Sequence, residues 1–444
     1  MKKRQVVSLA PSPEPLAPSL LIAGARLLDA ASELDDTGFV AIENGLIAHA
    51  GRKAPKGRFD RTLAAEGLWL MPGVVDLCAR LREPGATHKA TIRSEAAAAQ
   101  AGGVTTLVIP PDTRPVIDTP SVVDRIQSRV ARAGGIDVRV LGALTQNLGG
   151  EALPDMAALA AAGVVGVSNA FAPLANLLIT RRALEYAQGV GLTVHVVPQD
   201  PALAANGCAH EGAVATRLGL PPIPAAAETV AIAQWLALVE ETGARVHFGR
   251  LSTARGAEML AAARKAGLPV SADVAIHQLF LTEADVDGYD ATCRVVPPLR
   301  AAADRDALRD AVRKGVISAL CSDHQPHEAD AKINPFPLTE PGISALETLL
   351  PLTLRLVREK LLAPAQAAAR LTAGPAGILG IEAGALRAGA PAHLVLVDPE
   401  ARWTLRAADL RSAGHCTPFD GEEFRGRVAH TLHAGRSVYR APAP

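Results

Sequence analysis

The middle of the chain alternates between short apolar runs and longer, alanine-rich stretches with helical periodicity. Eight apolar runs of four to seven residues occur, at 74–78, 104–109, 138–144, 164–167, 192–197, 245–249, 269–274 and 317–322. Such runs are typical of parallel strands that are covered on both faces. Helical stretches such as 226–243 and 303–315 stand between them. This alternation predicts an α/β fold, a (β/α)8 TIM-type barrel over residues 72–377.

Both ends of the chain show a different pattern, in which short alternating stretches are separated by Gly and Asn turns. Residues 19–71 and 378–444 hold such stretches, for example LLIAGARLLD and HLVLVDPEARWTL. Alternation with a period of two predicts strands, so we expect the two ends to pack into one small composite β-domain. Residues 1–18 are rich in proline and serine and lack apolar periodicity, which predicts a flexible arm.

The composition excludes several classes of protein. Basic and acidic side chains are balanced at 45 each, which argues against a nucleic-acid or membrane-surface protein. The apolar stretches are too short to span a bilayer, and no signal-peptide core follows the basic first residues. Five cysteines stand singly, without a C-x-x-C pair. This favours reduced thiols and a cytoplasmic location.

Several segments resemble, in order, the motifs of dihydroorotases, which are members of the amidohydrolase superfamily. PGVVDLCARLREPG (72–85) resembles the family's P-G-x-x-D-x-H-x-H-x-R-E-P-G. Later motifs are matched by PPDTRPVID (110–118), SADVAIHQLFLT (271–282), RVVPPLR (294–300), CSDHQPHEADAK (321–332) and EPGISALETLLPL (340–352). The resemblance covers about residues 20–440. It implies the barrel with a satellite β-domain and a place in pyrimidine biosynthesis.

Dihydroorotases hold one or two Zn²⁺ ions with histidines and an acidic ligand or a carboxylated lysine, so the resemblance identifies positions where ligands should stand. Most carry other residues here: the strand-one histidines fall on Cys78 and Arg80, the bridging ligand on Asn169, the strand-five histidine on Val197 and the strand-six histidine on Arg250. The strand-eight aspartate is kept as Asp323. His195 lies two residues before Val197, so the strand-five register stays open between these two residues.

The two arginines change the chemistry of these positions. A guanidinium has no lone pair to offer a metal and keeps its charge. A unit charge about 4 Å from another costs roughly 4 kcal/mol at an effective dielectric near 20, and about twice that against a divalent ion. Cys78 and Asp323 alone are too few ligands for zinc. We therefore expect no metal and no cofactor here, and a salt bridge from Asp323, the vestigial general base, to Arg80 or Arg250.

The substrate contacts of the family are kept only in part. Arg82 keeps the arginine that holds the dihydroorotate carboxylate, and His327 keeps the second histidine of D-H-A-P-H. Asp112 and Val296 stand where the family has asparagines. Arg82 has two interpretations, which are the binding of an anion and an internal salt bridge with Glu83 or Asp112.

Other polar residues of the motifs have structural interpretations beside their functional ones. Asp76 could do no more than hydrogen-bond a loop, and His324 and His327 could serve loop packing. His277 is more consistent with a structural histidine than with a ligand. Cys78 and Cys321 are consistent with small buried apolar residues.

The resemblance, together with these replacements, implies a barrel that no longer catalyses. Some bacteria carry such an inactive dihydroorotase-like chain in a complex with the catalytic chain of aspartate carbamoyltransferase. We therefore expect a non-catalytic subunit that supports assembly of that holoenzyme in de novo pyrimidine biosynthesis. The resemblance implies a complex of six and six chains.

Two alternatives stay open. One is an active cyclic-amide hydrolase, dihydroorotase or hydantoinase-like, with a divergent metal site built from His195, His247, His277 and Asp323. Bound zinc with dihydroorotate turnover favours that hydrolase. The other is a sensor that binds an orotate-like anion through Arg82 and His327. Saturable orotate binding without turnover favours the sensor.

Overall fold

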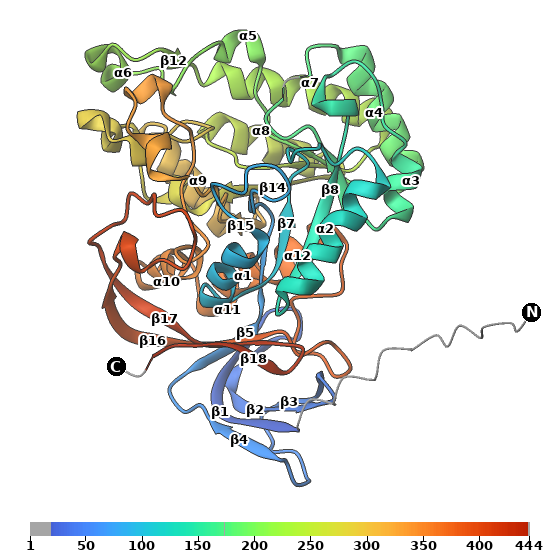
Figure 1. Ribbon diagram of the computed structural model, residues 1–444, viewed down its shortest axis with the longest axis vertical. Coiled ribbons are helices and arrows are strands. Elements are labelled where there is room, and N and C mark those ends of the chain that lie inside the picture. Colours follow the sequence, from blue (N-terminus) through green and yellow to red (C-terminus); the bar gives the residue numbers. More distant parts are fainter. Residues whose placement is uncertain (1–18, 173, 443–444) are drawn as a thin grey trace, which may run out of the picture.

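The computed structural model describes residues 19–172 and 174–442, and a ring of eight parallel strands runs through the upper part of the molecule (Figure 1). The strands are β6 (Val74–Asp76), β7 (Val104–Ile109), β8 (Asp137–Ala143), β9 (Gly166–Ser168), β10 (Val194–Val196), β13 (Val246–Phe248), β14 (Val270–Ala275) and β15 (Ala319–Cys321). They are hydrogen-bonded in this order. Each predicted apolar run overlaps one strand, so the predicted (β/α)8 barrel is confirmed.

The first and last strands of the ring meet only beyond their C-terminal ends. Ala79 and His324 form a parallel bridge there. The backbone N–H of Arg80 donates to the carbonyl of His324 at 2.9 Å, and the N–H of His324 donates to the carbonyl of Cys78 at 3.2 Å. The segments that follow β6 and β15 are therefore held side by side at this end of the barrel.

Helices surround the ring. They are α1 (Ile92–Ala101), α2 (Pro120–Ala133), α3 (Met156–Ala161), α4 (Leu177–Gly189), α7 (Ala226–Thr242), α8 (Ala254–Lys265), α9 (Ala302–Lys314), α10 (Leu349–Arg358), α11 (Pro364–Leu371) and α12 (Ala373–Leu379). In α2 the buried residues Val123, Ile126 and Val130 recur every three or four positions, so one face packs on the barrel. No helix within the described ranges is long and apolar enough to cross a membrane.

Smaller elements fill the connections between the main ones. The long connection between β10 and α7 holds α5 (Pro201–Ala204), β11 (Ala209–His210), α6 (Ala213–Leu218) and β12 (Pro222–Ile223). Short 3-10 helices lie at Gln146–Leu148, Ile276–Leu279, Glu283–Tyr289, Ala291–Cys293, Ala329–Lys332, Phe336–Leu338 and Ala407–Asp409. Most of them lie in loops on the C-terminal side of the strands, where they build the surroundings of the site.

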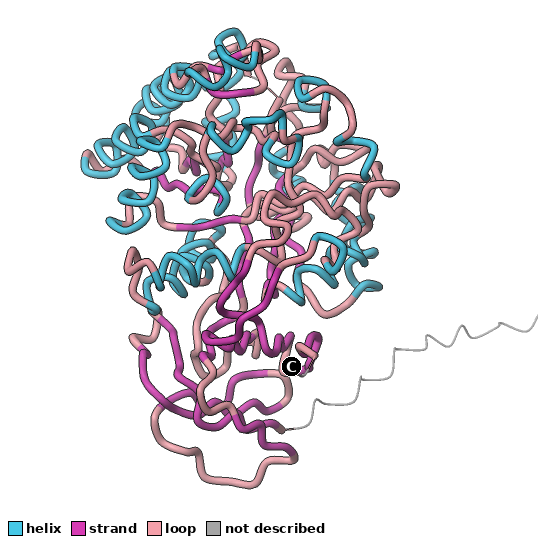
Figure 2. Tube along the Cα trace, turned by 90° about the vertical axis from the view of Figure 1, so that its left-hand side faces the viewer, coloured by secondary structure: helices cyan, strands magenta, loops and turns pink. Residues whose placement is uncertain are grey.

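The two chain ends build the second domain, which lies below the barrel in Figure 2. Its strands are β1 (Leu20–Asp29), β2 (Leu34–Glu43), β3 (Leu46–Gly51), β4 (Arg61–Ala64), β5 (Trp69–Pro72), β16 (Leu394–Thr404), β17 (Glu423–His433) and β18 (Arg436–Arg440). The sheet order is β18-β17-β16-β5-β1-β2-β3, with β4 beside β1. Antiparallel pairing of β5 with β16 joins the two ends, which confirms the predicted composite β-domain.

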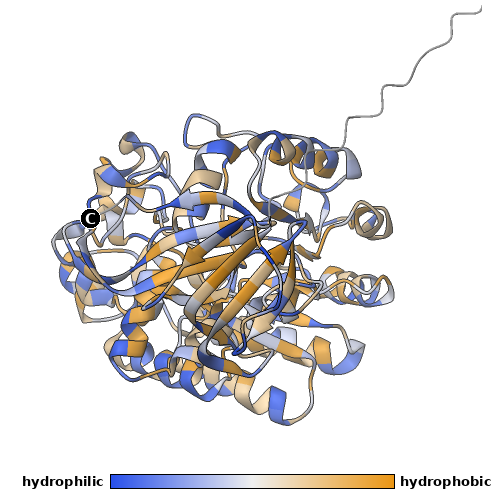
Figure 3. Ribbon diagram, turned by 90° about the horizontal axis from the view of Figure 1, so that it is seen from below, coloured by the Kyte–Doolittle hydropathy of each residue, from blue (hydrophilic) through white to orange (hydrophobic). Residues whose placement is uncertain are grey.

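This domain has a hydrophobic core of its own. The core includes Ile22, Val40, Ile42, Leu70 and Leu394. Figure 3 shows hydrophobic residues along the strands at the centre of the view from below. The predicted arm, 1–18, lies outside the described residues.

Gly73 connects β5 of the sheet domain to β6 of the barrel, and it has no room for a side chain. A Cβ atom at this position would lie 2.0 Å from Oγ1 of Thr105 and 2.4 Å from its Cγ2. The β-branched Thr105 is buried in β7, which pairs with β6, and its side chain has a restricted χ1. The passage between the domains therefore depends on a glycine.

We predict that Gly73→Ala lowers the free energy of unfolding by about 1–3 kcal/mol, because the methyl group overpacks against Thr105. Urea unfolding followed by circular dichroism measures the change. Gly189→Ala is the matched control, since no atom outside the local backbone of its own helix lies within 4 Å of its Cβ position. A Gly73→Ala variant as stable as the wild type would contradict this account of the junction.

Candidate functional site

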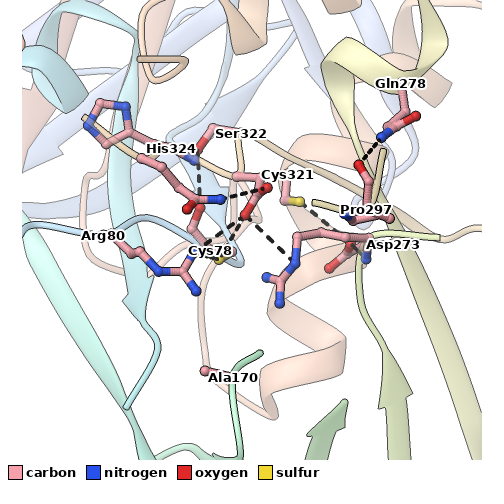
Figure 4. Close-up of polar contacts among 12 residues, drawn as sticks. Cys78, Arg80, Ala170, Asp273, Gln278, Pro297, Cys321, Ser322 and His324 are labelled. Carbon is pink, nitrogen blue, oxygen red and sulfur yellow. Dashed lines mark hydrogen bonds and ion pairs between the residues drawn. The ribbon is translucent and has the colours of Figure 1, made fainter. Parts of the chain in front are cut away.

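The residues that the sequence singled out lie where the loops leave the C-terminal ends of the barrel strands, here called the barrel mouth. Cys78 and Arg80 follow β6, Arg250 follows β13 and Asp323 follows β15. All four are buried, with 2–7% of their surface exposed. Figure 4 shows Cys78 and Arg80 close together at this mouth. The fold thus brings together four residues that are far apart in the sequence.

The carboxylate of Asp323 is shared by both arginines. Its Oδ1 lies 3.7 Å from Nη1 of Arg80 and 3.7 Å from Nε of Arg250. Burial raises the pKa of Cys78 to about 12, so the thiol is protonated and donates to Oδ1 at 3.5 Å. The amide of Gln325 donates to Oδ2 at 3.1 Å. The predicted salt bridge is confirmed, and it involves both guanidinium groups.

Two further residues hold the guanidinium groups in place. Nε of Arg80 donates to Oδ2 of Asp112 at 2.8 Å. The ring of Phe171 lies 4.6 Å from the guanidinium of Arg80 and 5.2 Å from that of Arg250. An aromatic face at this distance attracts a cation, so Phe171 reduces the repulsion between the two like charges. The pattern of motifs did not single out Phe171.

Asp273 orients Arg250 from the neighbouring strand. It accepts the backbone N–H of Arg250 at 2.6 Å and a hydrogen bond from Nε2 of His247 at 2.9 Å. Burial alone would raise the pKa of Asp273, but the hydrogen bond and the charge of His247 hold it below its ordinary value. The sequence motifs did not single out this residue. The feature of the sequence that points to it is an acidic residue within the apolar run of β14.

The backbone at the mouth adopts an unusual conformation. Arg82, Ala170, Arg250 and Asp323 have φ angles of 61°, 49°, 57° and 47°. This left-handed region is unfavourable for residues other than glycine, and such strain clusters at functional sites. It also turns the chain at the strand ends, so the side chains there do not follow the alternation of a strand.

Asn169 and Val197 do not join the cluster around Asp323. The hydroxyl of Thr145 donates to Oδ1 of Asn169 at 2.7 Å. Asn169, Val197 and His195 line a cavity of about 410 Å³, which Phe171 also lines. His195 lies within β10 opposite His247, whereas Val197 follows the strand end. The position of the family's strand-five histidine thus has two neighbouring residues in this chain, the buried His195 and the half-buried Val197.

Two histidines near the mouth each have a ring nitrogen that makes no hydrogen bond among the described residues. Among the described residues, Nε2 of His195 and Nδ1 of His277 are buried without a hydrogen-bond partner. Burial lowers the pKa of His277 to about 4, against the opposing charge of Asp323. Both nitrogens of His247 are engaged, by Ser271 and by Asp273. In the part of the chain that the structure describes, no three His, Cys, Asp or Glu donors converge at this mouth.

Arg82, which the family pattern assigns to the substrate carboxylate, is in contact with the loop that follows β15. Arg82 donates through Nε to the carbonyl of Pro326 at 3.0 Å, and its Nη2 lies 3.0 Å from Nε2 of His327. Burial and the neighbouring charges of Arg82 and Lys89 lower the pKa of His327 to about 2, so its ring is neutral.

The alternative of an internal salt bridge between Arg82 and Glu83 or Asp112 is wrong. Asp112 pairs with Arg80, and Glu83 pairs with Arg129 at 3.2 Å. Arg82 instead donates to the carbonyl of Pro326 and lies beside the neutral ring of His327, both on the loop that follows β15.

Asp76 links the first and last strands, and His324 links the last strand to α1 and to the segment at Ala345. Asp76 accepts a hydrogen bond from the backbone N–H of Ser322 at 2.8 Å and another from the Ser322 hydroxyl. Nδ1 of His324 accepts the backbone N–H of Ala345 at 3.0 Å, so Nε2 carries the proton and donates to Glu95 at 2.7 Å. Both residues thus have the hydrogen-bond partners that their structural interpretation requires.

Comparison with known proteins agrees with the motifs. Residues 67–255 match the family model described as dihydro-orotase-like, and residues 207–438 match that of the amidohydrolase family. A dihydroorotase-like protein of Pseudomonas aeruginosa is 49% identical over 422 residues, covering 95% of this chain and 99% of that protein. A dihydroorotase of Anaeromyxobacter dehalogenans is 40% identical, covering 95% of this chain and 98% of that protein.

Solved structures share the fold at lower sequence identity. L-hydantoinase (dihydropyrimidinase) from Arthrobacter aurescens has a TM-score of 0.87 at 22% identity, with 95% of this chain and 96% of that chain covered. Dihydropyrimidinase from Brevibacillus agri has a TM-score of 0.83 at 20% identity, with 95% of each chain covered. At this level of identity the likeness establishes the barrel and its satellite domain.

We predict strong coupling between Arg250 and Asp323. Arg250→Met should lower the free energy of unfolding by about 3 kcal/mol, because it weakens the pairing of a buried carboxylate. Asp323→Asn should also destabilise, but the double variant should lose at least about 1 kcal/mol less than the sum of the two. Urea unfolding of the four proteins measures this coupling. Arg255→Met on α8 is the control, since that side chain is 71% exposed. Additive losses of unfolding free energy in the Arg250→Met and Asp323→Asn variants would refute the coupling.

Asp76 should make stability depend on pH. Burial raises its pKa to about 7 against the hydrogen bonds from Ser322, so the folded state holds this proton more tightly than the unfolded state. Its contribution to stability is therefore present below about pH 4 and is lost as pH rises through about 7. The difference in unfolding free energy between wild type and Asp76→Asn should change over this window. Burial also raises the pKa of Glu347 to about 7. Glu347 is present in both wild type and Asp76→Asn, so its contribution cancels in this difference. Parallel pH profiles would show that Asp76 does not titrate in this way.

Proposed function

The chain belongs to the dihydroorotase-like amidohydrolase family, and we propose that within this family it is a non-catalytic subunit. Its role is to support assembly of the aspartate carbamoyltransferase holoenzyme in de novo pyrimidine biosynthesis. The observation that carries the non-catalytic part is the pairing of Arg80 and Arg250 with Asp323 at the barrel mouth.

The residues at the mouth do not fit the zinc ions that the family resemblance implies. Asp323, the one residue kept among the family's ligand positions, is already paired with two fixed positive charges and accepts hydrogen bonds on both oxygens. The Cys78 thiol is protonated at neutral pH, since its pKa is raised to about 12 by burial. A divalent ion there would have to overcome two guanidinium charges without histidine ligands in their place. Without an activated water, Asp323 has no nucleophile to deprotonate.

The state of the substrate pocket supports the same conclusion. Arg82 and His327, which the family pattern assigns to the substrate carboxylate, contact each other and the loop carbonyls of Pro326 and Pro341. An orotate-like anion would have to displace these contacts. It would also meet Asp112 close to the arginines, and that carboxylate repels an anion. The sensor alternative therefore receives little support from the geometry.

The competing function is a cyclic-amide hydrolase with a divergent metal site. The uncommitted nitrogens of His195 and His277 favour it, as do relatives named dihydroorotase. His247, the third histidine of that hypothesis, is engaged on both nitrogens. Recruitment of His247 would cost the buried hydrogen bond to Asp273.

The proposed partner follows from the resemblance. An inactive barrel of this family retains the outer surface on which an assembly can be built. We expect the catalytic chain of aspartate carbamoyltransferase to occupy part of that surface, with six copies of each chain in the complex. A location in the cytoplasm, where that pathway operates, is part of the same proposal.

The proposal predicts a large complex without hydrolase activity. The chain should be purified alone and together with the aspartate carbamoyltransferase chain of the same organism. Light scattering should then give the mass of a six-plus-six complex for the mixture. Dihydroorotate turnover, assayed with and without added Zn²⁺, should stay at background for both samples.

Two outcomes would overturn the proposal. Zinc-dependent turnover that is abolished by Asp323→Asn would establish the hydrolase at the barrel mouth. Elution of the two chains as separate species at micromolar concentration would remove the assembly role. Arg93→Ala, at an exposed arginine in α1, serves as the control variant for turnover.

A further inference from the structure

Three metal-ligand side chains meet far from the barrel mouth, at the junction of the two domains. Asp137 is the first residue of β8, His393 directly precedes β16, and His433 is the last residue of β17. The barrel therefore supplies a carboxylate and the sheet domain supplies two imidazoles. Asp137 and Asp323 stand at opposite ends of their strands, so this cluster is independent of the barrel mouth.

The donor atoms of this cluster are close together. One ligand atom from each of the three residues lies within 4.8 Å of the others. Nε2 of His433 is 3.2 Å from Oδ1 of Asp137, and Nε2 of His393 is 3.5 Å from its Oδ2. The two rings stack with their centroids 4.3 Å apart. All three side chains are largely shielded, with 16–35% of their surface exposed.

The chemistry of these donors suits a first-row transition ion. Two imidazole nitrogens and one carboxylate oxygen are a common set for zinc, and a water molecule can complete the tetrahedron. Burial alone would raise the pKa of Asp137, but the hydrogen bonds and charges of His393 and His433 hold it well below its ordinary value. The carboxylate is therefore ionised and available at neutral pH.

The hydrogen bonds show what a metal ion would have to displace. Nδ1 of His393 accepts the backbone N–H of Ala434 at 3.1 Å, so the ring proton lies on Nε2, toward Asp137. A metal ion must remove this proton, and the stacked rings must turn apart to point their lone pairs at one centre. Rotation about the last torsion of a histidine is soft. Arg139, 3.7 Å from Asp137, is 43% exposed and can move into solvent.

An ion can reach the cluster from solvent. His393 lines a cavity of about 650 Å³ at the lower end of the barrel, together with Gly73, Thr105 and Pro391. Glu382 and Arg387 also line this cavity, so the approach carries one charge of each sign.

We propose that Asp137, His393 and His433 form a site for Zn²⁺ or a similar divalent transition-metal ion that joins the barrel to the sheet domain. In the metal-free state a proton on His393 occupies the place of the ion, so protons and metal compete for the same nitrogens. The role is structural, because the cluster lies away from the residues of the barrel mouth.

The test is calorimetric titration of Zn²⁺ into the full-length, chelator-treated protein at pH 7.5. We expect one zinc ion per chain, with binding at least about tenfold weaker in both Asp137→Asn and His433→Asn. Binding should also weaken at pH 6, since protons compete with the metal. Zinc should raise the thermal midpoint of wild type more than that of either variant.

The matched control is His430→Asn. His430 lies on the same strand, but its Nε2 contacts Ser437 at 2.6 Å and it is outside the cluster. That variant should bind zinc as wild type does. The proposal is overturned if wild type binds no zinc, or if zinc binding persists unchanged in Asp137→Asn and His433→Asn. Zinc lost in Asp323→Asn instead would place the ion at the barrel mouth, against both this site and the proposed function. Circular dichroism of the metal-free variants verifies that each one folds.

Discussion

The sharing of one buried carboxylate by two guanidinium groups organises the mouth of this barrel. Asp323 lies 3.7 Å from a nitrogen of Arg80 and from one of Arg250, and it is almost fully excluded from solvent. A buried charge of this kind is costly unless it is paired and hydrogen-bonded. Asp112 pairs with the guanidinium of Arg80, and Asp273 accepts the backbone N–H of Arg250. The network connects segments at β6, β7, β13, β14 and β15, so much of the ring depends on it.

The same network accounts for the proposed loss of hydrolase activity. In the family the positive charge at this position belongs to metal ions, which also activate water. Guanidinium groups supply the charge that Asp323 needs, but they cannot activate water. The hydrogen bonds of Arg82 and His327 to the neighbouring loop close the substrate side in a similar way. On this proposal the chain keeps the barrel and the joined β-domain, and their outer surface is what an assembly subunit requires.

Much of this could be predicted from the sequence, and the limits have physical causes. The eight strands were visible because buried parallel strands are apolar throughout, and the salt bridge followed from the charges at positions 80, 250 and 323. The partners of the arginines were not visible. Asp112 and Asp273 contact Arg80 and Arg250 only because the ring of strands brings distant segments together. The left-handed backbone at Arg250 and Asp323 removes the strand alternation that would have shown where the side chains of these two residues point. Of the two interpretations of Arg82, the internal ion pair was wrong because a loop that is 244 residues later in the chain supplies its acceptor.

The central claim is that two guanidinium groups stand at the barrel mouth in place of metal ions. Crystals of the full-length protein grown with excess Zn²⁺, with diffraction data collected on both sides of the zinc absorption edge, test it most directly. We predict no anomalous peak within about 3 Å of the Asp323 carboxylate, well beyond the ordinary zinc–oxygen distance, with Arg80 and Arg250 both within 4 Å of that carboxylate. A zinc peak bound to Asp323, with either arginine turned away from it, would contradict the claim.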